Sequence, residues 1–285
     1  MKQRGGRIIL MATEAGTIHV GRPARSFNRF ELKYLVDRQT AVAFRDDVVG
    51  RLDPDPHHVD GGYTVWSRYY DSTDLHCYWQ KIDGIRFRRK LRVRHYGSTE
   101  LLRSTTPVWV EIKQRIDRST QKKRIRLPYG EALRLCDGRV EVDHEPVDAR
   151  VVGEVLSLAH ERDLRPVCLV GYEREALLGR DADLGLRITF DRRLRGRDRD
   201  LDLGIDALNR HLIRPDLMVI EVKVDERVPY WLTNRLAAHS LRLVRLSKYC
   251  QGVEAFGQAP RSVFHIPESD DPVPDRASDR QEGKT

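Results

Sequence analysis

The chain of 285 residues lacks the cysteine patterns of disulfide-rich and zinc-binding proteins. Its four cysteines, Cys77, Cys136, Cys168 and Cys250, are widely spaced, and none belongs to a C-x-x-C pair. We therefore expect neither a zinc site nor a dithiol redox motif. Isolated cysteines of this kind are typical of small apolar side chains in a reducing compartment, which predicts a cytoplasmic protein.

Long apolar runs and the familiar nucleotide-binding loops are also absent. No stretch approaches the length needed to span a membrane, and "IILMA" near the N-terminus is too short for the core of a signal peptide. The sequence contains no G-x-x-x-x-G-K-[ST] loop, no H-E-x-x-H motif and no dinucleotide-binding fingerprint. No transmembrane segment is expected, and the sequence leaves a membrane partner undetermined.

Aromatic residues are scarce at 7%, whereas charged residues make up 33% of the chain and give a net charge of +8. A basic balance of this size favours an anionic partner. Proteins that bind single-stranded nucleic acid usually add aromatic side chains that stack on the bases. Because the charged segments carry few aromatics, we do not expect nucleic acid to be the partner.

The two ends of the chain differ from its middle. Residues 1–26 show no clear periodicity and are predicted to form a flexible leader, with Met1 or Met11 as the start. Residues 263–285 are rich in Pro, Asp and Ser and are predicted to be a disordered tail. One folded domain, 27–262, is expected between them.

Strand patterns outnumber helix patterns in this domain. The expected helices are one capped by Asp37 with Val42, Phe44 and Val48 on its apolar face, and two more at 145–162 and 229–241. Strands are expected at about 27–36, 63–71, 85–96, 107–114, 123–128, 167–178, 185–191 and 217–225. The predicted class is α+β, built around antiparallel sheet.

Three of these strands carry a glutamate and a lysine two residues apart, so that both side chains point to the same face. The pairs occur in "FELKY", "WVEIKQ" and "IEVKV". Three other strands, "RKLRVRHY", "KRIRLP" and "GLRITFD", gather basic residues on one face. For a single strand, the more frequent explanation is a sheet face exposed to water. Six such strands favour charged faces that converge on one site.

Convergence is expected if the sheet closes with its apolar faces outward, beneath helices packed outside. The charged faces would then line a tunnel, in which crowded cations repel one another and are costly to desolvate. A multiply charged anion would relieve both effects, and the glutamates could hold Mg²⁺ or Mn²⁺ beside it. The residue pattern thus predicts a metal-bound polyphosphate inside a closed antiparallel β-barrel.

Eight motifs occur in a fixed order: "FELKY", "RYYDS", "KLRVRHYG", "VWVEIK", "GYERE", "LRITFD", "VIEVK" and "LSKY". Over about 27–252 they resemble the VTC domain, the polyphosphate polymerase domain among the CYTH-like triphosphate tunnel metalloenzymes. The resemblance implies a tunnel-shaped antiparallel barrel that uses Mn²⁺ or Mg²⁺, ATP and inorganic polyphosphate, and that releases ADP. A triphosphatase acting on ATP or inorganic triphosphate is the alternative, and a non-catalytic polyphosphate-binding protein is the third.

The resemblance also implies roles for individual residues. The catalytic set would be Lys33, Arg92, Arg94, Lys113 and Arg187. The phosphate- and nucleotide-binding set would be Lys90, Arg124, Arg174, Lys223, Arg245, Ser247 and Lys248. The metal ligands would be Glu221, Glu111 and Glu31, with the alternative that Glu31 and Glu111 orient Lys33 and Lys113.

Overall fold

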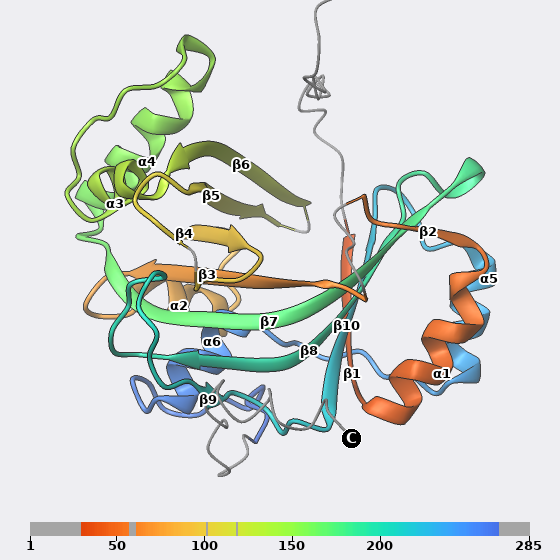
Figure 1. The fold of residues 1–285 in the computed structure, drawn as a ribbon. Coiled ribbons are helices and arrows are strands. Elements are labelled where there is room, and N and C mark those ends of the chain that lie inside the picture. Colours follow the sequence, from red (N-terminus) through yellow and green to blue (C-terminus); the bar gives the residue numbers. More distant parts are fainter. Residues whose placement is uncertain (1–29, 57–60, 101, 118, 268–285) are drawn as a thin grey trace, which may run out of the picture.

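The computed structural model describes residues 30–56, 61–100, 102–117 and 119–267. The predicted leader, 1–26, and residues 268–285 of the predicted tail lie outside them. The main feature is one antiparallel sheet with the strand order β1-β10-β8-β7-β3-β4-β5-β6 (Figure 1). Its strands are β1 (Phe30–Asp37), β3 (Tyr63–Asp71), β4 (Phe87–Tyr96), β5 (Pro107–Ile116), β6 (Ser119–Pro128), β7 (Arg165–Gly179), β8 (Arg187–Arg197) and β10 (Leu217–Val224). Two short strands, β2 (Leu52–Pro54) and β9 (Arg210–His211), pair with β7 and β8.

Each strand segment expected from the alternation of apolar and charged residues is a strand in the structure. In β10, Ile220 and Val222 are fully buried against helices, whereas Glu221 and Lys223 point to the opposite face. Since paired residues of an antiparallel ladder share a face, the charged residues of neighbouring strands also lie together. We call the face that carries these charges the inner face.

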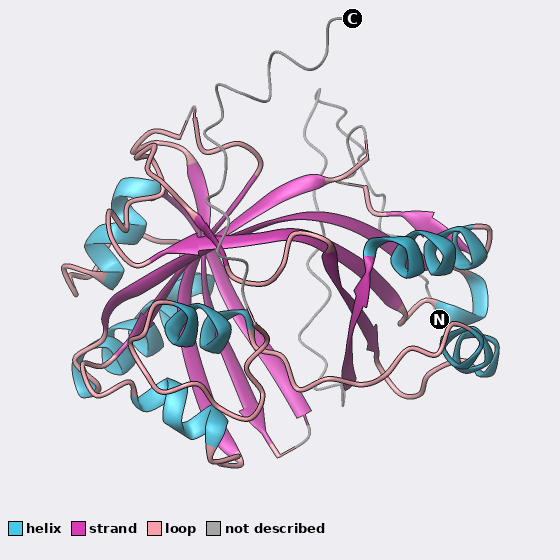
Figure 2. Ribbon diagram, turned by 90° about the horizontal axis from the view of Figure 1, so that it is seen from below, coloured by secondary structure: helices cyan, strands magenta, loops and turns pink. Residues whose placement is uncertain are grey.

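Four helices cover the apolar, outer face in two groups, which lie on either side of the strands (Figure 2). The first group packs on β1, β8 and β10, and the second on β4, β5 and β6. The first contains α1 (Arg38–Val49) and α5 (Tyr230–Ala238), and the second contains α3 (Tyr129–Cys136) and α4 (Ala149–Glu161). Single-turn 3₁₀ helices occur at Pro146–Asp148 and Asp181–Asp183.

Helix α1 begins where the sequence predicts, because the Asp37 carboxylate accepts a hydrogen bond of 2.8 Å from the Thr40 backbone N–H. Its buried residues are Ala41, Phe44 and Val48. They follow the three- and four-residue spacing of one helix face. Val42 lies outside that spacing and is exposed, so its predicted place on the apolar face is wrong.

Two helices that the sequence patterns do not predict, α2 (His76–Ile82) and α6 (Lys248–Ala255), pack on the inner face instead. There Tyr249 and Val253 of α6 join Cys168, Val170 and Tyr172 of β7 in one apolar cluster. The expectation that all helices pack outside the sheet is therefore wrong. Part of the inner face is apolar, and these two short helices cover that part.

The predicted closed barrel is wrong, because the sheet is open. Strand β6 pairs only with β5, and β1 pairs with β10 on one side. The other edge of β1 is occupied by the segment before α6: the Val244 N–H donates to the Lys33 carbonyl at 2.8 Å, and Tyr34 bridges to Leu243. Since those backbone groups are already paired, no ladder joins β1 to β6. What remains is an open antiparallel sheet in an α+β fold.

Nothing in the described part of the chain is both long and apolar enough to serve as a helix crossing a membrane.

Candidate functional site

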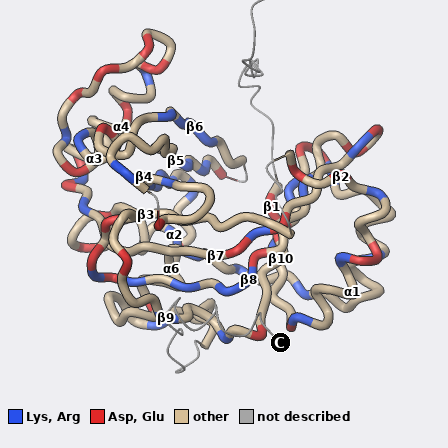
Figure 3. The backbone as a smooth tube through the Cα atoms, viewed as in Figure 1, with Lys and Arg blue, Asp and Glu red and all other residues tan. Residues whose placement is uncertain are grey.

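The ladder register brings the charged residues of β1, β10 and β8 into line across the inner face. Three successive rungs run Glu31–Lys223–Arg187, Lys33–Glu221–Thr189 and Leu35–Val219–Asp191. Acidic and basic positions therefore lie beside one another where these strands meet β7 (Figure 3). The Glu-x-Lys pattern places an acid of one strand opposite a base of its neighbour.

Glu221 is the centre of this arrangement and is almost fully buried. Its carboxylate accepts from Lys223 and Lys248, each at 2.7 Å, and lies 3.3 Å from both Lys33 and Arg174. Burial opposes ionisation, but Lys223, Lys248, Lys33 and Arg174 outweigh it and hold the pKa of Glu221 well below its usual value. Glu221 is therefore a carboxylate shared by four basic side chains.

Two further carboxylates extend the cluster. Lys33 Nζ lies 3.2 Å from Glu31, so that one ammonium bridges Glu31 and Glu221. Asp191 accepts two hydrogen bonds from Arg174, at 2.6 and 2.7 Å, and lies 2.6 Å from Lys248. The group therefore alternates positive and negative side chains, which is what allows so many charges to be buried together.

Contacts across the open side of the sheet show how strongly it curls. Lys113 Nζ, on β5, donates to Glu31 on β1 at 2.8 Å, although five strands separate the two along the sheet. The two ends of the sheet thus meet through side chains without a backbone ladder.

A second acidic centre lies on the β4–β5 part of the inner face. The buried Glu111 accepts from Arg92 at 2.6 and 2.8 Å and from Lys122 at 3.1 Å. Burial raises the pKa of Glu111, but Arg92, Arg94 and Lys122 outweigh it and hold that pKa far below its usual value. Glu111 therefore serves Arg92 and Lys122, whereas Lys113 is held by Glu31.

Arg94 differs from the other buried bases because its partners are neutral. It donates to the Ser67 hydroxyl at 3.0 Å and to the Tyr172 hydroxyl at 3.2 Å, and no ion pair joins it to a carboxylate of the described residues. Arg92 also donates to the Tyr69 hydroxyl at 3.2 Å. Arg94 is thus a buried positive charge whose excess is not cancelled directly.

Arg187 lies at the edge of the first cluster, where it donates to Asp55 at 2.6 Å and to the Tyr63 hydroxyl at 3.1 Å. Its Nε and the neighbouring Thr189 Oγ1 are buried, and neither has a hydrogen-bond partner among the described residues. Buried polar atoms are rarely left without one. These two atoms point to a ligand that the protein does not itself supply.

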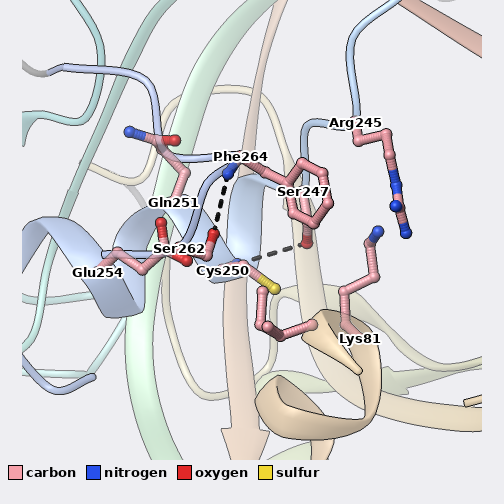
Figure 4. A pocket seen from close by; sticks show the side chains of 9 residues that line it. Lys81, Arg245, Ser247, Cys250, Gln251, Glu254, Ser262 and Phe264 are labelled. Atoms are coloured by element: carbon pink, nitrogen blue, oxygen red, sulfur yellow. Dashed lines mark hydrogen bonds between the residues drawn. The ribbon is translucent and has the colours of Figure 1, made fainter. Parts of the chain in front are cut away.

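The remaining candidates lie around these centres. Arg124 lies over the Trp109 ring at 4.1 Å, and Lys90 over the Tyr249 ring at 4.3 Å. Arg245 lies over the Phe264 ring at 4.3 Å and, with Ser247, lines a small pocket (Figure 4). Ser247 caps α6, which places the next residue, Lys248, at the first turn, facing Glu221.

Several residues of the cluster are missing from the sequence-based list: Asp191, Lys122, Tyr69 and Tyr172. The alternation contained a signal for two of them. Asp191 shares a strand face with Arg187, and Lys122 shares one with Arg124. The hydroxyl contacts of the two tyrosines depend on strand pairing and left no comparable signal.

The residues fit a divalent cation only as a partial site. Among the described residues, no three His, Cys, Asp or Glu side chains gather as a metal site. Glu31 and Glu221 approach the same Lys33 ammonium and can together offer two carboxylates, whereas Glu111 lies with Arg92 and Lys122. Mg²⁺ commonly uses one or two carboxylates and completes its shell with substrate phosphates. The donor set is therefore suited to a metal that arrives with a phosphate ligand.

A curled antiparallel sheet that buries an excess of basic side chains around a few carboxylates defines a protein built to bind a multiply charged anion. The chain belongs to the VTC domain family, whose model matches residues 28–256. No curated protein matches the chain.

Two solved structures have a similar chain course. One, a provisionally assigned adenylate cyclase of Bacillus halodurans, is 14% identical with a TM-score of 0.43, and the match covers 77% of this chain and 95% of that one. The other, a provisionally assigned adenylate cyclase of Vibrio parahaemolyticus, is 10% identical with a TM-score of 0.37, and covers 76% and 90%.

Proposed function

We propose that the protein is a metal-dependent polyphosphate polymerase, which transfers the γ-phosphoryl group of ATP to the end of an inorganic polyphosphate chain and releases ADP. The observation that carries the proposal is the buried group in which Lys33 bridges Glu31 and Glu221. A site for an anion alone would be weakened by carboxylates, whereas a site for an anion together with a divalent cation needs both signs. Membership of the VTC domain family supports the same reading.

Phosphoryl transfer depends on positioning and charge neutralisation more than on covalent help from the protein. Lys33 and Arg187 would hold non-bridging oxygens from the β1–β8 side, and Arg92 and Arg94 from the β4 side. The terminal phosphate oxygen of the acceptor chain forms the new bond to the γ-phosphorus. The bond from that phosphorus to the oxygen bridging to the β-phosphate breaks, and its electron pair leaves with ADP.

Mn²⁺ or Mg²⁺, held by Glu221 with Glu31, would supply further positive charge to the phosphate oxygens. For this to happen, Lys33 must leave its place between the two carboxylates, and a phosphate oxygen is the natural new partner of its ammonium. The acceptor phosphate is already anionic near neutral pH, so no side chain has to remove a proton from it.

The test is to incubate the purified full-length chain with ATP and Mn²⁺ and to resolve the products on a gel. A ladder of polyphosphate with one ADP per phosphate transferred is the expected result. Free phosphate without polymer would assign the chain as a triphosphatase instead. Binding of polyphosphate without any turnover would make it a binding protein, and either of these outcomes overturns the polymerase.

A further inference from the structure

Five basic side chains lie beyond the acidic centres, at one end of the inner face, and we call them the basic end: Lys81, Arg88, Lys90, Arg115 and Arg245. They come from α2, β4, β5 and the segment before α6. None of them forms an ion pair with a carboxylate in the described part of the chain. Lys81 and Arg245 line the same small pocket, where their side chains approach each other (Figure 4).

The register of β4 and β5 shows how the basic end arises. The inner-face rungs run Arg92–Glu111, then Lys90–Lys113, then Arg88–Arg115. An acid thus faces the base at the first rung only, and like charges face each other at the next two. Successive rungs on one face are about 6.6 Å apart, so the row extends roughly 13 Å from Arg92 to Arg88.

Such a row is unfavourable for folding alone. Like charges directly opposite in a ladder are destabilising, by about 0.2–1 kcal/mol per pair. Burial, with repulsion from Arg245, Lys90 and Arg88, lowers the pKa of Lys81 to about 8. Burial, with repulsion from Arg115 and Arg245, also lowers the pKa of Arg88. The protein therefore keeps these charges together without compensating them, which is the mark of a site whose partner is an anion.

The aromatic rings at this end are already covered by cations. Lys90 lies over Tyr249 and Arg245 over Phe264, each at 4.3 Å. A nucleic acid would need free ring faces on which its bases could stack. A linear phosphate chain needs only charge at regular spacing, which the row of rungs supplies.

We propose that the basic end is a retention site for linear inorganic polyphosphate, separate from the catalytic cluster, which holds the part of the chain that extends beyond it. The proposal rests on the proposed polymerase function, because it gives the far part of the substrate chain a place on the protein. Lys90 and α6 connect the two regions, since Lys248 faces Glu221 while the adjoining Ser247 lines the pocket of Lys81.

The test compares the affinities of the full-length chain for long linear polyphosphate and for inorganic triphosphate, measured in EDTA without ATP. The variant is Lys81→Gln with Arg88→Gln, because neither residue belongs to the catalytic cluster. A matched control, Arg38→Gln with Arg150→Gln, removes two exposed arginines elsewhere. We expect the affinity for the long chain to fall about tenfold or more in the variant, while triphosphate binding changes by less than about twofold.

An unchanged affinity for the long chain, or an equal loss for both ligands in a variant with the wild-type melting temperature, would overturn the proposal. So would tighter binding of a single-stranded oligonucleotide or of phosphatidylserine vesicles than of polyphosphate, abolished by the same variant. Because no turnover is needed, a failure of ATP conversion to polymer is recorded separately and leaves this measurement intact. If polymer is made, the variant should release shorter chains at an unchanged initial rate of ADP formation.

Discussion

At the scale of the residue, the central fact is that one buried carboxylate serves four basic side chains. Glu221 contacts Lys33, Arg174, Lys223 and Lys248. One negative charge cannot compensate four positive ones, even with Asp191 and Glu31 nearby. The cluster is therefore stable only because part of its charge is shared, and it should respond sharply to the loss of Glu221.

Replacing Glu221 by Gln preserves the shape of the side chain but removes its charge. Because Lys33, Arg174, Lys223 and Lys248 would then repel one another in a buried site, the free energy of unfolding should fall by about 3–5 kcal/mol, measured by urea titration. Inorganic triphosphate should restore much of the loss. In the activity assay, the same variant should lose Mn²⁺-dependent ADP release. Full ATP-to-polyphosphate activity of Glu221→Gln at saturating Mn²⁺ would remove Glu221 from the metal site.

Lys223 should take up a proton when a phosphate ligand binds. Burial lowers its pKa from 10.5 to about 7, and repulsion from Arg174 adds to the effect against the attraction of Glu221. At pH 8 the side chain is therefore mostly neutral in the free protein, and an anion should recharge it. Calorimetry with saturating triphosphate, in two buffers of different ionisation enthalpy, should show up to about one more proton taken up by wild type than by Lys223→Gln.

The same shift gives a stability change of definite sign. Between about pH 7 and 10.5 the unfolded chain binds the Lys223 proton and the folded chain does not, so this side chain makes stability rise with pH across that window. The slope of unfolding free energy against pH should be smaller in Lys223→Gln. Equal slopes in the two proteins would show that Lys223 keeps its ordinary pKa.

At the scale of the element, the two helices on the inner face depend on one acidic side chain. The buried Asp71 carboxylate, in "RYYDS", accepts from the backbone N–H groups of Cys77 and Tyr78 at 2.8 and 3.0 Å. It also accepts from the hydroxyl of Tyr249 on α6. Asp71 therefore anchors the start of α2 and ties α6, with its neighbouring Lys248, to the end of β3.

Replacing Asp71 by Asn should loosen both helices. The amide offers an N–H₂ where the site supplies only donors, so at least one buried donor loses its acceptor and the free energy of unfolding should fall by about 2 kcal/mol or more. Hydrogen exchange should increase at the amides of α2 and α6 before it increases in the sheet. Asp74→Asn is the control, because Asp74 is exposed in the same loop. Equal exchange in the two variants would contradict the anchoring role.

The strands were predictable and these two helices were not, for a physical reason. Alternation such as that of Ile220, Glu221 and Val222 is local, so it identifies both the strand and its charged face. Helix α2 has seven residues and α6 has eight, and α6 is buried nearly all round, so neither shows an amphipathic stripe. Their positions follow from distant contacts, such as that between Asp71 and Tyr249.

At the scale of the whole molecule, convergence of the charged faces and closure of the sheet are separate questions. The contact between Lys113 and Glu31 brings the two sheet ends together at their side chains. Closure also needs free backbone groups on both edges, and Val244 already takes those of β1. Nothing in the pattern of "FELKY" could predict that a segment some 200 residues later would occupy its edge.

The uncompensated positive charge of the inner face should make salt and triphosphate act in opposite ways on the whole protein. In the free protein, raising the ionic strength to about 0.15 M shortens the screening length to about 8 Å and weakens repulsion among the buried and half-buried bases, so the melting temperature should rise. At a triphosphate concentration of about 100 times Kd, binding should add about 2.7 kcal/mol of stability. That corresponds to roughly 5–10 °C for a chain of this size.

With triphosphate at a fixed concentration, the same salt should lower the melting temperature, because it screens the attraction between the anion and Lys33, Arg174 and their neighbours. The measurement is a set of thermal melts at low and moderate salt, with and without triphosphate. Arg38→Gln with Arg150→Gln should keep the reversal, since those arginines lie on the outside. A free protein that salt destabilises as much as it destabilises the complex would mean that the carboxylates already balance the inner face.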